Sequence, residues 1–278
     1  MNLIMKSSNK LFFIILVLVH FLPSCSNSKI ENENEKSNSK AKNNDNLLVE
    51  NELVNPIDTN ALAKFILPGF YHSDEFSKKD KNENCFGIFK NKKECYLAET
   101  KIKTHRYFDE IVDEDSLHPT GWEITTLNKD TCLALISNLD YLENKSIEQI
   151  DLSQKKLYGK KPIFFKYNEI EYQLFSTGKR TVDPESPDYV EITDFKLYFS
   201  AKIGGKEIKE LIVEQDNFNL DNGLRIIFAG DIDGDGKLDL IVDCSDHYNV
   251  SNPVLFLSRP AGKNHLLKKV GEHRSVGC

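Results

Sequence analysis

Four aspartates crowd into nine residues of this chain, within the stretch GDIDGDGKLDLIV from Gly230 to Val242. They are Asp231, Asp233, Asp235 and Asp239. Carboxylates at alternate positions point toward one centre when the chain curls, and Gly236 permits the sharp bend that such a curl needs. Without a cation, four clustered carboxylates would repel one another and raise their own pKa values.

The spacing D-x-D-x-D-G-x-x-D therefore predicts a cation site made of oxygen ligands. Each of the four aspartates would supply a carboxylate, and Lys237 would supply its backbone carbonyl. We expect Ca²⁺, because it accepts oxygen ligands at about 2.3–2.6 Å in a flexible geometry. Mg²⁺ is the less suitable ion because it keeps several of its own waters.

The frame around this loop is strand, loop, strand rather than that of an EF-hand. Position 12 is Val242, where an EF-hand needs a bidentate glutamate. The stretch AGDIDGDGKLDLIV resembles the FG-GAP or VCBS type of calcium repeat, found in the β-propellers of integrin α-chains and in many bacterial surface proteins. The resemblance covers about twenty residues and one copy, whereas a propeller needs at least about four blades. The resemblance implies a metal that holds the loop against its sheet. Because there is a single copy, we do not expect a propeller.

The first residues predict export. Lys6 and Lys10 precede an apolar run from Leu11 to Leu22, which has the length of a signal-peptide core and is too short to span a bilayer comfortably. We expect a signal peptide over residues 1–24. An ordinary secretory signal is the alternative to the lipoprotein signal described next.

The end of this run, Leu22-Pro23-Ser24-Cys25, resembles a bacterial lipobox, with Pro23 as a departure from the usual small residue. The resemblance implies cleavage before Cys25 and lipidation of that cysteine, and several acyl chains on one residue give stable attachment to a membrane. Ser26, rather than aspartate, follows Cys25 and implies export to the outer membrane. The expected location is therefore the bacterial cell envelope, at the outer membrane as Ser26 implies, and the lipid anchor makes the membrane one partner.

Composition divides the remaining chain into a tether and a folded part. Residues 25–56 begin with a polar run that cannot bury enough surface to offset its chain entropy, so we expect a lipidated disordered tether there. Residues 57–278 should form a mostly-β domain. The proline-containing stretch at 181–188 is a candidate boundary between two halves of that domain.

Charge restricts the partners. The whole chain has a formal net charge of −7, and removal of Lys6 and Lys10 with the signal changes this value to −9. This acidic balance argues against a nucleic acid partner and against binding to an anionic membrane surface.

The folded part reads as many short strands separated by turn residues, which favours mainly antiparallel β-sheets in a sandwich or a curled, barrel-like form. Asp58–Leu67 has a polar cap and helical spacing, stopped by Pro68-Gly69, so one of the few short helices is expected there. The predicted strands are Phe86–Lys90, Glu94–Ala98, Trp122–Thr126, Leu133–Ile136, Ile163–Tyr167, Ile170–Phe175, Tyr189–Ser200, Glu207–Val213, Leu224–Ala229, Leu238–Val242 and Val254–Leu257.

Five cysteines follow Cys25, and an exported protein can form disulfides. Cys85 and Cys95 flank a predicted hairpin, so a cross-strand bond is one alternative. A bond from Cys244 to Cys278 is another, and Cys132 in an apolar run reads as a buried thiol. The sequence does not decide the connectivity.

Other residues that could do chemistry are scattered. Cys244 and His247 could form a nucleophile pair or half of a zinc site, against the simpler reading of a disulfide and a loop histidine. The acidic run Asp109–Asp115 could supply paired carboxylates for glycoside hydrolysis, but such a run is more often a solvated turn. His105, His118 and His265 read as surface or core residues.

As a whole, the chain resembles exported bacterial lipoproteins that carry a single calcium loop near the C-terminus, a resemblance that implies no particular activity. The expected function is a binding or interaction module at the cell envelope, with a structural calcium site and an unknown envelope or extracellular partner. The alternative is an extracytoplasmic hydrolase of envelope or extracellular polymers. A cleft with convergent acids would favour the hydrolase, and an exposed apolar or aromatic patch would favour the binding module.

Overall fold

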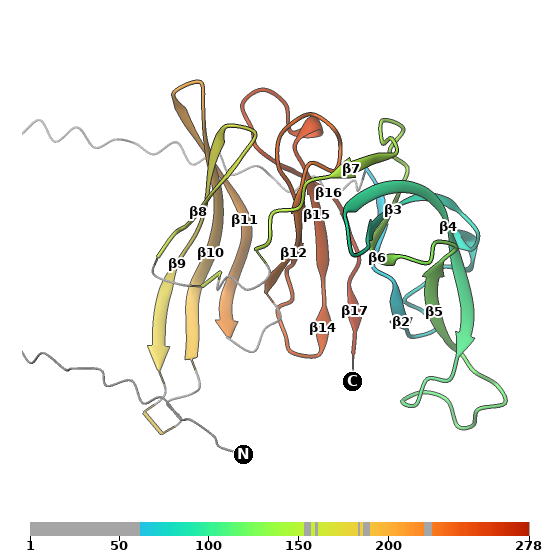
Figure 1. The fold of residues 1–278 in the computed structure, drawn as a ribbon. Coiled ribbons are helices and arrows are strands. Elements are labelled where there is room, and N and C mark those ends of the chain that lie inside the picture. The colour runs from blue at the N-terminus through green and yellow to red at the C-terminus, as the bar shows by residue number, and fades with distance from the viewer. Residues whose placement is uncertain are drawn as a thin grey trace, which may run out of the picture. The chain divides into compact units, whose positions relative to one another are not determined.

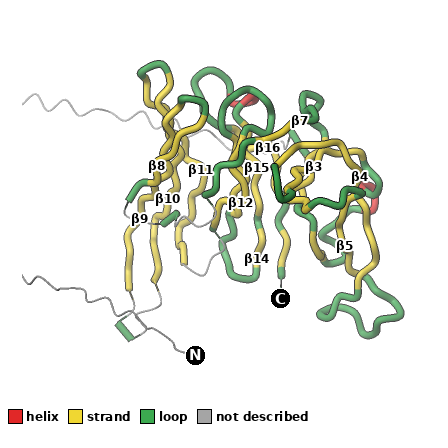
Figure 2. The backbone as a smooth tube through the Cα atoms, viewed as in Figure 1, coloured by secondary structure: helices red, strands yellow, loops and turns green. Residues whose placement is uncertain are grey.

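A computed structural model describes residues 62–152, 157–158, 161–182, 184–185, 190–219 and 224–277. These residues belong to one compact unit that extends from Asn51 to Cys278. Within them the regular secondary structure is almost entirely β-strand (Figures 1 and 2). The predicted signal peptide, Cys25 and the tether lie outside the described residues.

The first sheet, here called the N-terminal sheet, has seven strands and curls into a half-barrel. Its spatial order is β1-β6-β3-β4-β5-β2, and β7 pairs with β4. The bounds are β1 (Lys64–Ile66), β2 (Gly69–Tyr71), β3 (Asn84–Lys90), β4 (Cys95–Tyr107), β5 (Gly121–Thr126), β6 (Thr131–Ser137) and β7 (Lys145–Ile147). The long strand β4 makes the curl, because its first half pairs with β3 and its second half pairs with β5.

Two four-stranded antiparallel sheets follow. The middle sheet has the order β11-β10-β9-β8, and the C-terminal sheet has the order β12-β13-β15-β16. A ribbon of β14 and β17 completes the strands. Their bounds are β8 (Ile163–Tyr167), β9 (Ile170–Val182), β10 (Val190–Ile203), β11 (Lys206–Asn219), β12 (Arg225–Gly230), β13 (Asp239–Asp243), β14 (Val250–Ser251), β15 (Pro253–Leu257), β16 (Lys268–Glu272) and β17 (Ser275–Val276).

The C-terminal sheet is buried on both faces. Along β13, Leu240 and Val242 pack into the core shared with the middle sheet, while Ile241 packs into the core shared with the N-terminal sheet. β15 alternates in the same way. Because strand side chains point to opposite faces in turn, an unbroken apolar run can fill two cores at once. The run after the aspartates is therefore what lets this sheet pack between the other two.

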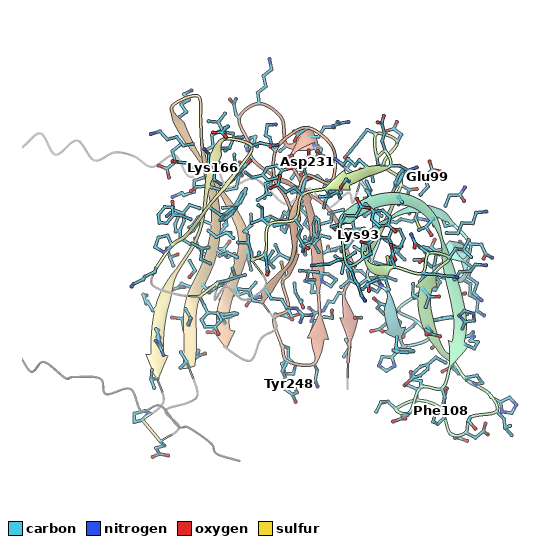
Figure 3. All side chains as sticks on the ribbon, viewed as in Figure 1. Lys93, Glu99, Phe108, Lys166, Asp231 and Tyr248 are labelled. Carbon is cyan, nitrogen blue, oxygen red and sulfur yellow. The ribbon has the colours of Figure 1, made fainter. Side chains whose placement is uncertain are left out.

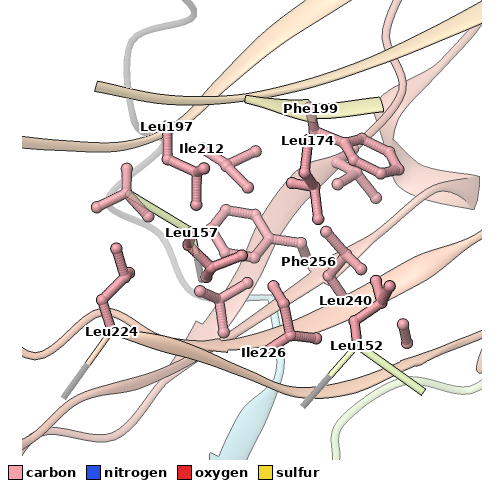
Figure 4. Packing of buried hydrophobic residues seen from close by; sticks show 14 of the residues in the cluster. Leu152, Leu157, Leu174, Leu197, Phe199, Ile212, Leu224, Ile226, Leu240 and Phe256 are labelled. Atoms are coloured by element: carbon pink, nitrogen blue, oxygen red, sulfur yellow. The ribbon is translucent and has the colours of Figure 1, made fainter. Parts of the chain in front are cut away.

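Aliphatic and aromatic side chains fill the core between the middle and C-terminal sheets. Figure 4 shows Leu174 and Phe199 on one side, with Ile226 and Leu240 on the other. Tyr172 stacks on Phe199 with ring centroids 5.3 Å apart. Full burial of each such aliphatic or aromatic side chain stabilises the fold by about 1.5–3 kcal/mol.

The inside of the half-barrel forms a separate, smaller core around Trp122, which is almost fully buried. Its indole nitrogen donates to the carbonyl of Ser73 at 3.2 Å. The guanidinium of Arg106 lies 3.5 Å from the ring centroid and the ammonium of Lys81 lies 4.1 Å from it. Cation–π contacts of this kind add to the stability that burial of the ring provides.

The expected fold class is confirmed, since the structure is built of antiparallel sheets with two short 3₁₀ helices, η1 (Lys78–Asp80) and η2 (Arg259–Ala261), among the described residues. Each predicted strand falls on an observed one, although β4, β9 and β11 run longer than expected. β9 and β10, on either side of the stretch 181–188, pair with each other in one sheet.

The helix expected at Asp58–Leu67 is wrong for its described part. Lys64–Ile66 is instead strand β1, paired with Leu135–Ser137 of β6. Phe65 packs into the core beneath the C-terminal sheet and Ile66 packs into the half-barrel. Two adjacent side chains that fill opposite cores require the period of a strand, and this demand overrides the helical spacing.

The described cysteines carry free thiols, and a bond between Cys85 and Cys95 is excluded by register. Cys85 lies opposite Thr100 and Cys95 lies opposite Lys90, so the two are five positions apart along the ladder, or roughly 16 Å. Cys132, expected to be buried, is partly buried, and burial raises its pKa to about 12. Cys278 lies outside the described residues.

A first test concerns the tight packing just before the aspartate loop. A Cβ on Gly230 would lie 2.8 Å from the Ile147 side chain and 2.9 Å from the Glu148 carbonyl. Gly230→Ala should therefore lower the free energy of unfolding by about 1–3 kcal/mol, measured by denaturant unfolding. The control is Gly277→Ala, whose Cβ would lie 3.7 Å from the nearest atom. Equal stability of the two variants would contradict the packing described here.

Candidate metal centre

The aspartate loop connects β12 to β13 at one end of the C-terminal sheet (Figure 3). Gly234 and Gly236 have φ angles of 76° and 83°, in the left-handed region that favours glycine. These two residues turn the backbone around the aspartates, as the spacing predicts. The loop is therefore a compact turn whose carboxylates face inward.

Three of the four predicted carboxylates come together. Asp231, Asp233 and Asp239 each offer an oxygen that lies within 4.8 Å of the others. Asp239 has an exposed fraction of 0% and Asp233 of 3%. This is an all-oxygen donor set in a mostly buried position, which suits a hard cation such as Ca²⁺.

Asp239 is the centre of a hydrogen-bond network. One of its oxygens accepts from the backbone N–H groups of Ile232 at 2.6 Å and Asp233 at 3.0 Å. The other oxygen accepts from the N–H of Ser258 at 2.7 Å, across the sheet at the end of β15. One carboxylate thus fixes the start of the loop to a segment nineteen residues away in the chain.

The remaining aspartates bind backbone groups as well. Asp231 accepts from the N–H of Gly234 at 2.6 Å and of Gly236 at 3.1 Å. Asp233 accepts from the N–H of Arg259 at 2.9 Å. Since an oxygen that accepts one hydrogen bond retains a second lone pair, these bonds orient the carboxylates and leave acceptor capacity for a cation.

The electrostatics of the cluster are unfavourable without a cation. Burial and the charge of Asp233 raise the pKa of Asp239 well above its ordinary value. Burial also raises the pKa of Asp233, and the charges of Asp235 and Asp231 add to this effect. A cation between these oxygens would reverse the shift.

Asp235 lies outside the group of three. It accepts from the Ser258 hydroxyl at 2.8 Å and pairs with the Lys237 ammonium at 2.8 Å. Burial alone would raise the pKa of Asp235, but the hydrogen bonds from Lys237 and Ser258 hold it below its ordinary value. Its metal role, like that of the Lys237 carbonyl, stays a prediction.

Three residues beside the cluster have no signal in the local sequence pattern. The ammonium of Lys145, from β7, lies 3.5 Å from Asp231. The guanidinium of Arg259 lies 5.1 Å from the ring of Tyr141. The buried hydroxyl of Tyr141 has no hydrogen-bond partner among the described residues, and burial together with the charges of Asp233 and Asp239 raises its pKa to about 12. An orphaned hydroxyl next to three carboxylates fits an oxygen-lined cation site.

The loop also contacts the other two sheets. The side-chain amide of Asn168, in the β8–β9 turn, donates to the Gly236 carbonyl at 2.9 Å. The N–H of Leu238 donates to the Tyr172 hydroxyl at 3.3 Å. With Lys145 from the N-terminal sheet, the loop therefore joins all three sheets at one point.

Cys244 and His247 do not form a reactive pair in the structure. Burial raises the pKa of the Cys244 thiol far above its ordinary value, which makes it a poor nucleophile. His247 is exposed, accepts from the N–H of Asn249 at 3.2 Å and lies against the ring of Tyr248. His247 fits the simpler interpretation of a loop histidine, whereas the disulfide expected for Cys244 is wrong, because Cys244 carries a free thiol.

The acidic run Asp109–Asp115 is a structured loop. Asp113 accepts from the N–H of Asp109 at 2.8 Å and from the N–H of Thr120 at 2.9 Å. Hydrogen bonds from Thr120 lower the pKa of Asp113. Asp109 is buried and lies 2.5 Å from Nδ1 of His72, and this bond raises the pKa of His72. No spacing in the sequence indicated that pair, because its members are far apart in the chain.

The three scattered histidines do not gather. His105 lies 3.9 Å from Glu123 and His118 lies 3.3 Å from Asp115, both at the surface. His265 lies 3.0 Å from Glu210. Each lies beside a different carboxylate, in agreement with their interpretation as surface or core residues.

No protein-family model matches this chain, and neither a curated protein nor a solved structure matches it. The resemblance of the aspartate loop to FG-GAP repeats and that of Leu22–Cys25 to a lipobox remain predictions. Within the described residues, the search for a helix long and apolar enough to cross a membrane finds none.

A second test concerns Asp239 itself. Asp239→Asn replaces one accepting oxygen with an NH₂ group that faces buried N–H donors, so it should cost about 1–3 kcal/mol of unfolding free energy in EDTA. The control is Asp246→Asn at an exposed pair with Arg274, which should change stability by less than about 0.5 kcal/mol. Denaturant unfolding measures both. A harmless Asp239→Asn would show that the network is not needed for the fold.

Proposed function

We propose that this chain is a calcium-stabilised binding module of a bacterial cell envelope, attached to the membrane by lipid on Cys25. Calcium is structural in this proposal and takes no part in a reaction. Asp231, Asp233 and Asp239 hold it, with Asp235 and the Lys237 carbonyl as the further ligands that the loop spacing predicts.

The observation that carries the proposal is the placement of Asp239, fully buried, with oxygens of Asp231 and Asp233 within 4.8 Å. Buried carboxylates this close raise one another's pKa, so an apoprotein would have to protonate one of them or bear their repulsion. A divalent cation removes both costs at neutral pH.

The structural role of the cation follows from the backbone groups that the same carboxylates bind. Asp239 and Asp233 accept from the N–H groups of Ser258 and Arg259, and the loop contacts all three sheets. A cation bound by these side chains would stabilise the folded state by linkage, because the unfolded chain lacks the site.

Support for binding comes from the distribution of exposed apolar side chains. Eleven large ones are exposed among the described residues, and five of them line one open groove of about 680 Å³. We call it the aromatic groove. The five are Phe70, Tyr107, Ile111, Tyr248 and Val276. Such gathered apolar surface marks interaction sites, whereas scattered apolar residues do not.

The alternative function, hydrolysis of envelope or extracellular polymers, has the His72–Asp109 pair in its favour, since both residues line the aromatic groove. However, Asp109 is bound to His72, and Asp113 is bound to Thr120. Both carboxylates are thus engaged in holding the loop. Binding is therefore the better-supported function.

A calcium series tests the proposal. The full-length chain, in detergent micelles, should melt several degrees higher in Ca²⁺ than in EDTA, since saturation at a hundredfold excess over the dissociation constant adds about 2.7 kcal/mol. Asp233→Asn should remove this gain, and the exposed control Asp216→Asn should keep it. Calorimetric titration should give one Ca²⁺ per chain. A wild type that melts at one temperature in both conditions would refute the calcium site.

The pH dependence of the same gain has a definite sign. The folded-state pKa values of Asp233 and Asp239 are raised, so their contribution is fully present below the unfolded value of about 3.9 and is lost as pH rises through the folded values. Ca²⁺ competes with those protons. The increase in melting temperature caused by Ca²⁺ should therefore be larger at pH 7 than at pH 5, and a gain independent of pH would contradict this assignment.

Lipidation is tested by fractionation in a bacterial host. The wild type should partition into the detergent phase and show a mass increased by acyl chains, whereas Cys25→Ser should lose both properties. Ser28→Ala is the matched control and should behave as the wild type. Identical partitioning and unmodified mass for all three chains would exclude the anchor.

A further inference from the structure

The aromatic groove is built from four segments that are far apart in the chain. Its walls are Leu67–His72 with Glu75, Tyr107–Ile111 without Phe108, Tyr248–Ser251 and Ser275–Gly277. Asp231 and Tyr248 lie at opposite ends of the C-terminal sheet (Figure 3), so the groove is separate from the aspartate loop. Its residues have no role in the metal centre.

Strand edges line two sides of the groove. β2 is the last strand of the N-terminal sheet and pairs with β5, while β17 pairs with β14. Consecutive residues of β2 and of β17 line the groove. Because consecutive side chains of a strand point to opposite faces of its sheet, a groove lined by all of them must run along the edge of the strand. A strand edge that is not covered is a template for an added strand.

Aromatic side chains supply the apolar contact area. Phe70 is 59% exposed and lies 4.4 Å from Tyr107 between ring centroids. Tyr248 is 71% exposed and is supported by His247 at 4.3 Å. Aromatic residues that are held in place by a neighbour provide large contact area at low entropic cost, as interface anchors do.

Glu75 holds the two walls together. One of its carboxylate oxygens accepts from the N–H of His72 at 2.9 Å, and the other accepts from the N–H of Val276 at 2.6 Å. The carbonyl of Glu75 also accepts from the His273 ring nitrogen at 2.9 Å, if that nitrogen carries the proton. The groove is therefore braced across its width before a ligand arrives, which reduces the ordering cost of binding.

The lining is acidic. Glu75, Asp109 and Glu110 line the groove, and His72 is the only basic residue in the part of the lining that the structure describes. The whole chain carries a formal charge of −7. Charge complementarity therefore favours a basic ligand over an acidic or neutral one.

We propose that the aromatic groove binds an extended, basic peptide segment of a partner protein, which adds as a strand beside β2, since the Val276 N–H of β17 is already bound to Glu75. Apolar side chains at alternate positions contact Phe70, Tyr107 and Tyr248, and lysine or arginine side chains lie near Glu110. The inference rests on the proposed function as a binding module and names the partner chemistry of that module.

The probe is a fluorescein-labelled peptide of sequence LKLKLKLKL, with LELELELEL as the acidic counterpart. Fluorescence anisotropy with the full-length chain should show saturable binding of the basic peptide, at least tenfold tighter than that of the acidic one. Affinity should fall as salt rises from 50 to 500 mM, because rim charges are screened. Saturable binding in EDTA as well as in Ca²⁺ would show that peptide binding does not depend on the metal site.

Variants locate the site. Phe70→Ala and Tyr248→Ala should each weaken binding at least tenfold, and Glu110→Lys should weaken it as well. The matched control is Phe164→Ala on β8, whose side chain is 74% exposed and lies outside the groove. Thermal melts of all variants check folding. Amide hydrogen exchange at Gly69–Tyr71 should slow when the peptide binds.

Three outcomes would overturn the proposal: equal affinity for both peptides, a loss of binding in Phe164→Ala equal to that in Phe70→Ala, and unchanged exchange at Gly69–Tyr71. Binding of cellohexaose or chitohexaose that is lost in Phe70→Ala, without peptide binding, would also overturn it. That last result would leave the binding module intact, whereas a failed calcium series with intact peptide binding would remove only the metal site.

Discussion

The arrangement depends most on one buried carboxylate. Asp239 accepts three backbone N–H groups, two from its own loop and one from Ser258. Because it begins β13, the strand whose alternate residues fill two cores, its position fixes the C-terminal sheet between its neighbours. A carboxylate in this position is costly unless it is hydrogen-bonded and neutralised, and the proposed cation among the surrounding aspartates would neutralise it.

The aspartate loop and the aromatic groove lie apart, so the proposed metal site is separate from the proposed binding site. The aspartate loop holds one end of the C-terminal sheet, where all three sheets meet. The aromatic groove lies at the other end, between the half-barrel and the β14–β17 ribbon. Calcium in the loop would hold the three sheets together, and the groove would be free to contact a partner. The proposed metal and the proposed partner therefore use different residues and can be tested independently.

Patterns local in sequence predicted most of the fold and the centre of the site. Strands such as β8 and β13 are readable because their own apolar residues and turns specify them. The aspartate loop is readable because its four aspartates lie within nine residues. What depends on distant partners was missed: β1 is a strand because of β6 and two cores, and Lys145 and Ser258 reach the loop only after folding. The groove could not be predicted from the sequence, since its four walls come from segments that are far apart in the chain.

Amide hydrogen exchange at Ile232, Asp233 and Ser258 tests the central claim most directly, because these three N–H groups bind Asp239. Their exchange should be slower than that of the exposed turn Gly204-Gly205 in EDTA, and should slow further in Ca²⁺. Asp239→Asn should abolish the effect of Ca²⁺. Exchange as fast as in that turn, and insensitive to Ca²⁺, would contradict the claim that a buried, cation-binding carboxylate holds the sheets together.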